Sequence, residues 1–410
     1  MFIQNFLKLE NQKHFDYDHM VYVRLFEGCN LNCEHCYIPN NPKKIDSKFY
    51  ENNGLTETLI KESKIKEGSK LYIQWHGGEP TLLGVKYLEE AINNVEKDQR
   101  FVYQHGIQTN LINFSNNTKD WVSLYKRKFN SNIGVSWDFG IRHIKKSIKN
   151  EETNNLFEEI FWNNVNLAKQ NSINLYMVIT VTKLFFQKFK NPFDFYEFIS
   201  KKGIESLNFE RITNTGEARE TWEKLGLNNE EYSKNMSKFF KAYVAFKNAN
   251  PEIKLNISPF DGLLESVIKM IKGKGELNQQ SNLWDILSYK NQGYGCWSGT
   301  CDTKFHTIDS NGYKHGCTAL TSEQDNKNKL LAKNLNNKKI IWIGGTVEEQ
   351  KNNILNSRKD RQKSCEGCEF LSICSSGCLA VEKWDDSGEC SGAKKLFTTI
   401  KNSIVSTQRV

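Results

Sequence analysis

The feature that most constrains this 410-residue sequence is the uneven placement of its eleven cysteines. Three are close together at Cys29, Cys33 and Cys36, none lies between 37 and 295, and eight lie between 296 and 390. The count is odd, and Lys8 and Glu10 interrupt the N-terminal apolar residues before a signal peptide can form. We therefore expect a cytoplasmic protein, in which such cysteines bind metal or act in catalysis more often than they form disulfides.

Composition and charge argue against membrane and nucleic-acid roles. The chain has 38% hydrophobic and 25% charged residues, as globular proteins do, and it is long enough for two or three domains. The longest apolar run, near 175–181, is too short to span a bilayer. The formal charge is +8, but the basic residues alternate with acidic ones and do not form patches interleaved with aromatics.

The first half alternates strand and helix patterns, which predicts an α/β fold. Amphipathic stretches separate the strand-like runs, for example Val85, Leu88, Ile92 and Val95 at helical spacing. Right-handed βαβ units and a parallel sheet follow, either doubly wound or curved into a partial barrel. The expected strands are 20–27, 71–75, 101–108, 133–138, 173–182 and 206–210.

The remaining sequence predicts two further parts. Asn228 with Glu231 resembles a helix capping box, so we expect residues 218–292 to be a helical bridge. From 293 to 410 the chain is cysteine-dense and loop-rich, as expected where metal ligation replaces part of a core, with a helix at its end. The α/β domain is then expected to cover residues 18–217.

The segment Cys29-Asn-Leu-Asn-Cys33-Glu-His-Cys36 directly follows the first expected strand. Three cysteines can ligate only three irons of a 4Fe–4S cube, so one iron stays open to another ligand. At the carboxyl end of a parallel strand that open iron faces a ligand site. The alternative is a zinc site with His35 as the fourth ligand, although adjacent ligands at 35 and 36 are sterically awkward.

Polar and glycine-containing segments also end the next three strands. Gly77-Gly78-Glu79-Pro80 follows the second strand, and glycines there let the backbone approach a ligand closely, while a carboxylate can bind an ammonium group. Gln108-Thr109-Asn110 ends the third strand, and Val135-Ser136-Trp137-Asp138 ends the fourth. The alternative interpretation is that these residues only end strands and cap helices.

Together, these motifs resemble the radical S-adenosylmethionine (SAM) superfamily over residues 18–215. The resemblance implies a partial (β/α)6 barrel, a catalytic 4Fe–4S cluster on Cys29, Cys33 and Cys36, and SAM bound to its open iron. Reductive cleavage of SAM, with electrons from a donor such as flavodoxin or ferredoxin, then gives a 5′-deoxyadenosyl radical. The cofactor-binding residues implied are His35, His76, Gly77, Gly78, Glu79, Asn110, Ser136 and Asp138.

The C-terminal cysteines resemble a SPASM domain, a twin-cluster extension of this superfamily, over residues 293–392. The resemblance implies two fully ligated auxiliary 4Fe–4S clusters, although a zinc ribbon is an alternative for this half alone. The family's CxGGC appears here as Cys374-Ser-Ser-Gly-Cys378. The inner cluster would use Cys296, Cys301, Cys317 and Cys378, and the outer one Cys365, Cys368, Cys374 and Cys390.

SPASM enzymes mostly modify peptides, so the resemblance implies oxidation or cross-linking of a ribosomally made peptide or protein. Because the core begins near Met20, we expect any leader peptide to be held by a separate protein, by the helical bridge, or not at all. A sulfatase-maturase-like oxidation is an alternative, but Thr318 stands where that enzyme's base, an Asp, would follow Cys317; Asp302, after Cys301, would substitute only with a different loop geometry. Two further hypotheses are dehydrogenation of a small molecule and a non-catalytic metal scaffold that binds nucleic acid.

Overall fold

The computed structural model describes residues 2–4, 17–38, 53–145, 149–272, 295–300, 304–310, 314–315 and 347–408. Within these residues nine strands form one sheet in the order β7-β6-β5-β4-β3-β2-β1-β8-β9. Neighbouring strands are parallel except β8 and β9. The strands are β1 (His19–Phe26), β2 (Lys70–Gly77), β3 (Val102–Thr109), β4 (Asn132–Ser136), β5 (Asn174–Val181), β6 (Ser206–Arg211), β7 (Asn256–Ser258), β8 (Phe305–Ile308) and β9 (Lys314–His315).

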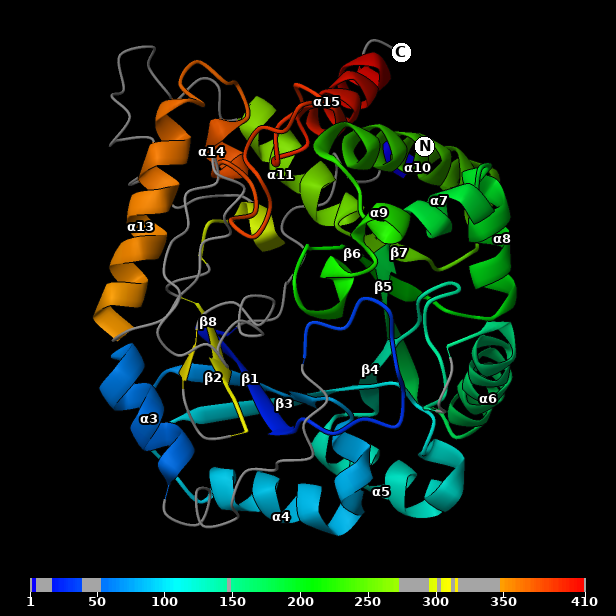
Figure 1. Cartoon of the computed structure of the whole chain (residues 1–410), viewed down its shortest axis with the longest axis vertical. Coiled ribbons are helices and arrows are strands. Elements are labelled where there is room, and N and C mark those ends of the chain that lie inside the picture. Colours follow the sequence, from blue (N-terminus) through cyan, green and yellow to red (C-terminus); the bar gives the residue numbers. More distant parts are fainter. Residues whose placement is uncertain are drawn as a thin grey trace.

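All six expected strands are present as β1 to β6, which confirms the parallel α/β fold. The structure adds strands at both ends of this series. β7 extends the sheet beside β6. β8 pairs with β1, with Val23 opposite Ile308, so a strand from the C-terminal part lies beside the first strand of the barrel (Figure 1).

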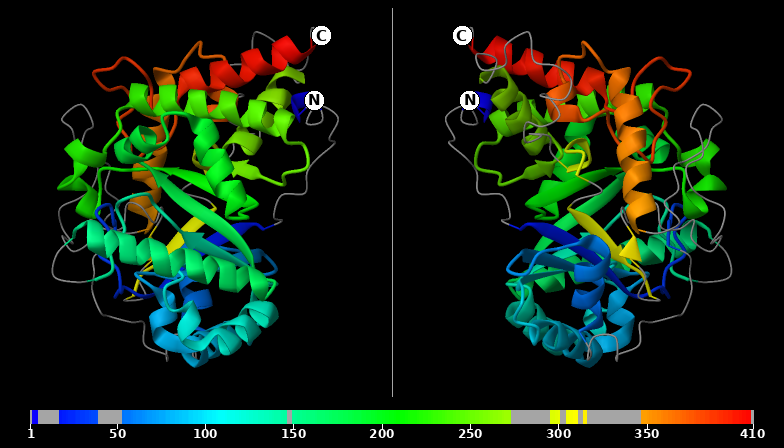
Figure 2. Two further views of the ribbon diagram at one scale, coloured as in Figure 1. Left: turned by 90° about the vertical axis from the view of Figure 1, so that its right-hand side faces the viewer. Right: turned by 90° about the vertical axis from the view of Figure 1, so that its left-hand side faces the viewer.

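The helices that connect the strands cover the outer face of the curved sheet (Figures 1 and 2). Strand residues that alternate toward them, such as Val23, Trp75, Val135 and Ile179, are fully buried; burial of such side chains is the main driving force for this packing. These helices are α3 (Gly54–Ser63), α4 (Gly84–Glu96), α5 (Thr118–Lys128), α6 (Glu151–Gln170), α7 (Lys183–Lys188) and α8 (Pro192–Lys201), with 3₁₀ helices η1 (Pro80–Leu83) and η2 (Phe114–Asn117).

The inner face of the sheet is polar, and two glycines make room for this. A Cβ at Gly106 would lie 2.2 Å from the Tyr72 hydroxyl and 2.4 Å from Gln74 Oε1. At Gly134 it would lie 2.1 Å from Gln108 Oε1. Long polar side chains therefore cross the neighbouring strand where that strand has no side chain of its own.

Between β6 and residue 272 the described chain is mainly helical, with one short strand, β7. Helix α10 starts with the capping box predicted from Asn228 and Glu231, whose side chains bond each other's backbone N–H at 2.7 and 3.0 Å. The domain boundaries at 217/218 and 292/293 stay a prediction. The later elements are η3 (Gly216–Arg219), α9 (Trp222–Leu225), α10 (Asn229–Ala249), α11 (Phe260–Lys272), η5 (Gly295–Trp297), α13 (Val347–Lys363), α14 (Leu371–Cys374) and α15 (Lys394–Gln408).

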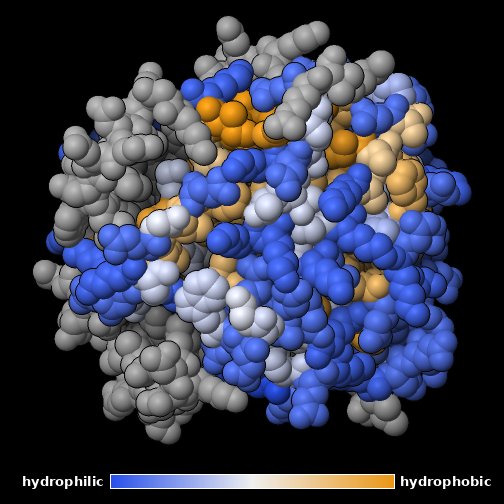
Figure 3. Space-filling model, turned by 90° about the horizontal axis from the view of Figure 1, so that it is seen from above, coloured by the Kyte–Doolittle hydropathy of each residue, from blue (hydrophilic) through white to orange (hydrophobic). Residues whose placement is uncertain are grey.

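No helix of the described residues is both long and apolar enough to span a membrane. Seen from above, over α10 and α15, the described surface is largely hydrophilic, and its hydrophobic residues form small separate groups (Figure 3).

Candidate functional site

The three N-terminal cysteines lie on the loop that leaves the carboxyl end of β1. Donor groups surround their sulfur atoms: the Leu31 N–H is 3.4 Å and the Asn110 Nδ2 3.8 Å from Cys29 Sγ. Arg142 Nη1 lies 3.8 Å from Cys33 Sγ. Donors and a guanidinium around sulfur stabilise anionic thiolates, so this set of residues fits a cluster held by three thiolates.

The thiols hold their protons until a metal displaces them. Burial, with a contribution from the Glu79 carboxylate, raises the pKa of Cys29 to about 12. Burial also raises the pKa of Cys33 and of Cys36, with the Arg142 charge opposing it. Ligation by thiolates must therefore release protons here, as it does in other metal sites.

Asp138 connects the end of β4 to the cysteine loop. Its carboxylate accepts from Arg142 Nε and Nη2 at 2.7 and 2.6 Å and pairs with His35 Nε2 at 3.1 Å. The Thr180 N–H donates to its other oxygen. Burial alone would raise the pKa of Asp138, but Arg142 and His35 outweigh it and hold the pKa well below its usual range.

His35 therefore has one ring nitrogen engaged and one available. Its Nδ1 is buried and has no hydrogen-bond partner among the described residues. In the same residues, no three Cys, His, Asp or Glu side chains are arranged to hold a single metal ion. The pairing of Nε2 with Asp138 disfavours the zinc alternative, and the orphaned Nδ1 fits a site that receives a further polar group.

The two glycines at the end of β2, Gly77 and Gly78, serve a close contact that the sequence did not indicate. A Cβ at Gly77, where φ is +148°, would lie 2.1 Å from the Phe26 carbonyl oxygen, and one at Gly78 2.4 Å from the Gly28 carbonyl oxygen. The Gly78 N–H donates to Phe26 O at 2.7 Å, and the Glu79 N–H to Gly28 O at 2.9 Å. The glycines thus bring the ends of β1 and β2 together below the cysteine loop.

Glu79 is fully buried and joins the ends of β2 and β3. One carboxylate oxygen accepts from the Thr81 N–H (3.0 Å), the Thr81 hydroxyl (2.6 Å) and the Thr109 hydroxyl (2.8 Å). The other accepts from the Asn110 N–H at 2.7 Å. Burial raises its pKa, with these hydrogen bonds opposing the shift. This geometry gives Glu79 a positioning role, and its expected contact to SAM stays a prediction.

The other expected cofactor residues lie at neighbouring strand ends. The Asn110 amide bonds Asn30 Oδ1 at 2.7 Å, so it contacts the cysteine loop. Ser136 accepts from Gln108 Nε2 at 2.7 Å on the inner face. His76 packs edge-on to Tyr22, and burial with the nearby Arg24 charge lowers its pKa to about 3, so it is neutral. The structure therefore gathers these residues at one end of the barrel.

A second anchor of the cysteine loop was not predicted. Glu34 accepts from Lys224 Nζ at 2.7 and 3.0 Å and pairs with His143 Nε2 at 3.1 Å. Burial acts to raise the pKa of Glu34, but these two partners outweigh it and hold the pKa below its usual range. The Thr221 hydroxyl also donates to the Glu34 carbonyl at 2.8 Å. Helix α9 therefore packs directly on the loop, through contacts 187 and 190 residues apart in sequence.

The described C-terminal cysteines lie near one another in two sets, Cys296 with Cys378 and Cys374 with Cys365, Cys368 and Cys390. A hydrogen bond from Cys296 lowers the pKa of Cys378 to about 6. Burial and the charges of Cys390, Cys365 and Cys368 raise the pKa of Cys374, so these four thiols lie together. Cys301 and Cys317 lie outside the described residues. The ligand roles of all eight cysteines stay a prediction.

Two buried arginines of α13 support the loop between these groups. Arg358 donates to the Ser375 carbonyl at 2.6 Å, and Arg361 to the Cys378 carbonyl at 2.8 Å. Ser375 and Ser376 have φ of +47° and +67°, in the left-handed region that favours glycine. The departure from CxGGC thus places one serine, Ser376, at a glycine position whose backbone has a left-handed φ.

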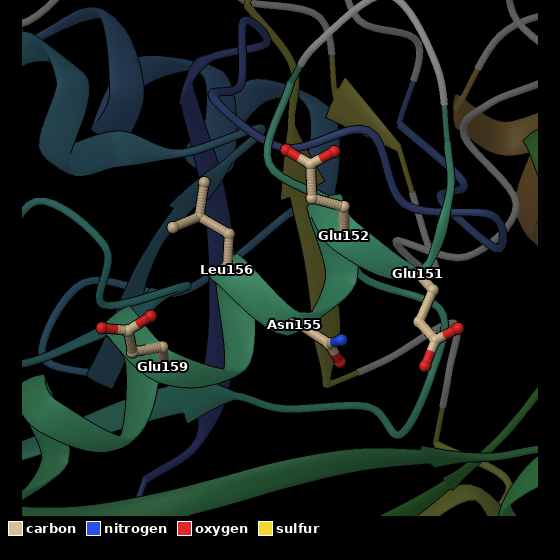
Figure 4. A pocket seen from close by; sticks show the side chains of 5 residues that line it. All are labelled: Glu151, Glu152, Asn155, Leu156 and Glu159. Carbon is tan, nitrogen blue, oxygen red and sulfur yellow. The ribbon is translucent and has the colours of Figure 1, made fainter.

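A shallow hollow on α6 lies on the outside of the barrel. It is lined by Glu151, Glu152, Asn155, Leu156 and Glu159, whose side chains come from successive turns of one helix (Figure 4). These acids form a solvated helix face and include none of the expected site residues.

Comparisons with known proteins agree with this geometry. Residues 23–191 match the Radical SAM superfamily. A cysteine-type anaerobic sulfatase-maturating enzyme from Clostridium novyi (strain NT) is 22% identical over 356 residues, which are 86% of this chain and 85% of the relative. The structure of native anSMEcpe with bound AdoMet and Kp18Cys peptide has a TM-score of 0.61 at 17% identity and covers 95% of this chain and 99% of that chain. Streptococcus suis SuiB bound to precursor peptide SuiA has a TM-score of 0.53 at 14% identity, over 89% and 72% of the two chains.

The barrel, its cysteine loop and the family match show that residues 23–191 form a radical SAM domain. More particularly, the fold of the chain is similar to those of anSMEcpe, over 95% of this chain, and SuiB, over 89% of it. Members of this superfamily bind SAM and a 4Fe–4S cluster, which together supply hydrogen-atom abstraction. In this chain Cys29, Cys33 and Cys36 would hold the cluster, while Asp138 positions the Arg142 guanidinium beside the thiolates.

Proposed function

We propose that this enzyme oxidises or cross-links residues of a ribosomally made peptide or protein. The observation that carries the proposal is the spatial grouping of the C-terminal cysteines, Cys296 with Cys378, and Cys365, Cys368 and Cys390 around Cys374. With Cys301 and Cys317 added to the first set, as the resemblance implies, two four-thiolate sites would suit two auxiliary 4Fe–4S clusters, and fully ligated clusters suit electron transfer. Such clusters would remove the second electron that an oxidation requires.

The proposal includes the cofactor and partner roles expected from the sequence. SAM would bind near His35, His76, Asn110, Ser136 and Asp138, at the end of the barrel where these residues gather. A flavodoxin or ferredoxin would reduce the first cluster. The SuiB structure holds a precursor peptide, which supports a peptide substrate here, with any leader peptide bound by α9–α11 or by a separate protein.

A second candidate is oxidation of one side chain in the manner of a sulfatase maturase. The Clostridium novyi relative, which matches 86% of this chain, supports it. Thr318 in place of the expected Asp weakens it, unless another carboxylate takes the proton.

One experiment distinguishes the two candidates. The anaerobically reconstituted enzyme, with SAM and a reductant, is given either a synthetic cysteine peptide of the sulfatase type or the peptide encoded beside its own gene. Cysteine replaced by a carbonyl, with loss of sulfur, supports the sulfatase-type reaction, whereas loss of two hydrogens with sulfur retained supports desaturation or cross-linking. If SAM is cleaved but neither peptide changes in mass, the proposed function is wrong.

A further inference from the structure

The last inner-face position of β6 carries a carboxylate, Glu210. Leu207 and Phe209 alternate toward the helices and are buried, so Asn208 and Glu210 lie on the inner, polar face. Glu210 is directly opposite Thr180 of β5, and the Thr180 N–H is the group that binds Asp138. Only β5 therefore separates Glu210 from Asp138, the residue that anchors Arg142 beside the cysteine loop.

Unlike Asp138 and Glu34, Glu210 has no cationic partner among the described residues, and unlike Glu79 it is exposed. Asp138 is paired with Arg142, and Glu34 with Lys224. The hydrogen bond that Glu210 accepts comes from the side-chain amide of Asn208, a neutral group on the same strand. Its neighbour Arg211 is engaged elsewhere, over the Tyr232 ring at 4.6 Å and with Asn229 Oδ1 at 2.8 Å.

The side chain of Glu210 is exposed and lies near one of the C-terminal cysteines. Its exposure leaves it accessible, while desolvation by the surrounding protein raises its pKa to about 6, and the negative charge of Cys378 adds to the shift. Cys378 belongs to the group expected to hold the inner auxiliary cluster. Glu210 is thus near Cys378 and, across β5, on the side of Asp138.

We propose that Glu210 is a catalytic residue that contacts the substrate side chain and takes the proton released when the side chain is oxidised. The proposal rests on the proposed function. Oxidation of a C–H next to a thiol, hydroxyl or amine removes one hydrogen atom from carbon, then one electron and one proton, and a carbon–heteroatom double bond forms. One-electron oxidants of the radical and iron–sulfur classes take the hydrogen atom and the electron, so the proton needs a base on the protein. In this chain Thr318 stands in place of the Asp that would follow Cys317 in a sulfatase maturase, and Glu210 takes over the role of the base.

The test compares Glu210→Gln with wild-type holoenzyme on whichever of the two peptides above the wild type oxidises, deuterated at the reacting carbon. A general base contributes about 10²- to 10⁴-fold, so product formation should fall by that factor. Transfer of deuterium to 5′-deoxyadenosine should stay within a few-fold of wild type, since it precedes loss of the proton. Glu205→Gln makes the same chemical change just before β6, where the side chain is exposed, and should leave both rates unchanged.

A second variant separates catalysis from folding. In Glu210→Ala, added formate or acetate should restore product formation in proportion to its concentration, whereas a structural defect would not respond. Product formation by Glu210→Gln at the wild-type rate, with wild type active, would refute the role of Glu210 alone. A wild-type enzyme that cleaves SAM but oxidises neither peptide would refute the proposed function and this role with it.

Discussion

Replacing Asp138 by asparagine tests how strongly the structure depends on the charge at the end of β4. The side chain is fully buried, and one oxygen takes two hydrogen bonds from Arg142, at 2.6 and 2.7 Å. Asparagine has nearly the same shape and can still accept the Thr180 N–H. The substitution therefore removes the negative charge and leaves the Arg142 guanidinium, whose side chain is 12% exposed, without its partner.

The expected cost follows from this geometry. Two charges about 4 Å apart attract by about 4 kcal/mol at the effective dielectric of a protein, and removing one partner of a buried pair costs about 3–5 kcal/mol. Because the Thr180 bond survives, we expect the lower end, about 3 kcal/mol. The pKa of Asp138 is depressed in the folded state, so its contribution is present above the unfolded pKa of about 4 and is lost as the pH falls toward the folded value.

The assay is anaerobic urea unfolding of the reconstituted enzyme, followed by tryptophan fluorescence. A loss of 3 kcal/mol lowers the midpoint by roughly 1 M for an m-value near 3 kcal/mol/M. The difference from wild type should be constant above about pH 5 and shrink below about pH 4. Asp120→Asn, an exposed position in α5, is the control and should cost less than about 0.5 kcal/mol. Equal midpoints for the two variants at pH 7 would contradict the reasoning.

Three further predictions concern the loops around the cysteines. Lys224→Met should lower the free energy of unfolding in urea by no more than about 1 kcal/mol, because that side chain is 52% exposed and its charge is screened. Glu34→Gln weakens the bonds of Glu34 to both Lys224 and His143, so it should cost about 2–3 kcal/mol. Gly78→Ala should lower stability by about 1–3 kcal/mol and reduce the iron bound per chain, since its Cβ would meet the Gly28 carbonyl at 2.4 Å; wild-type iron content would contradict this. Ser376→Gly should raise the thermal midpoint, because glycine relieves roughly 1 kcal/mol of left-handed strain at φ +67°; a lower midpoint would show that the serine side chain matters more.

The strands of the fold were predictable to the extent that they are long and apolar. β1 to β6 carry alternating or continuous buried residues, and the sequence located each of them. β7 has three residues, and β8 is the tetrapeptide Phe-His-Thr-Ile. Both are strands because β6 and β1 provide backbone partners. Such pairing joins residues far apart in sequence, and no local pattern records it.

The site was predictable in place but less so in physical detail. Cysteine spacing located the cysteine loop, and the strand-end motifs located its neighbours. From the sequence we expected the glycines at 77 and 78 to leave room for a ligand. In the structure they also let the end of β1 approach closely, because a Cβ at either position would clash with a carbonyl oxygen of Phe26 or Gly28. The contact of Glu34 with Lys224 spans 190 residues, and neither residue stands out in the sequence.

For Glu210, in contrast, the sequence itself indicates that no cationic partner lies nearby along the chain. Asp138 finds its partner four residues along the chain, in Arg142, and Glu27 pairs with Arg24, three residues before it, at 3.6 Å. No basic residue lies three or four positions from Glu210, where the sequence has Ser, Leu, Thr and Asn. The adjacent Arg211 cannot take that place, because successive strand residues point to opposite faces. An acid without a basic residue at these spacings can still be paired by a residue distant in sequence, as Glu34 is by Lys224, so in a barrel sequence this criterion selects candidates such as Glu210, and the structure then decides which of them lack a cationic partner.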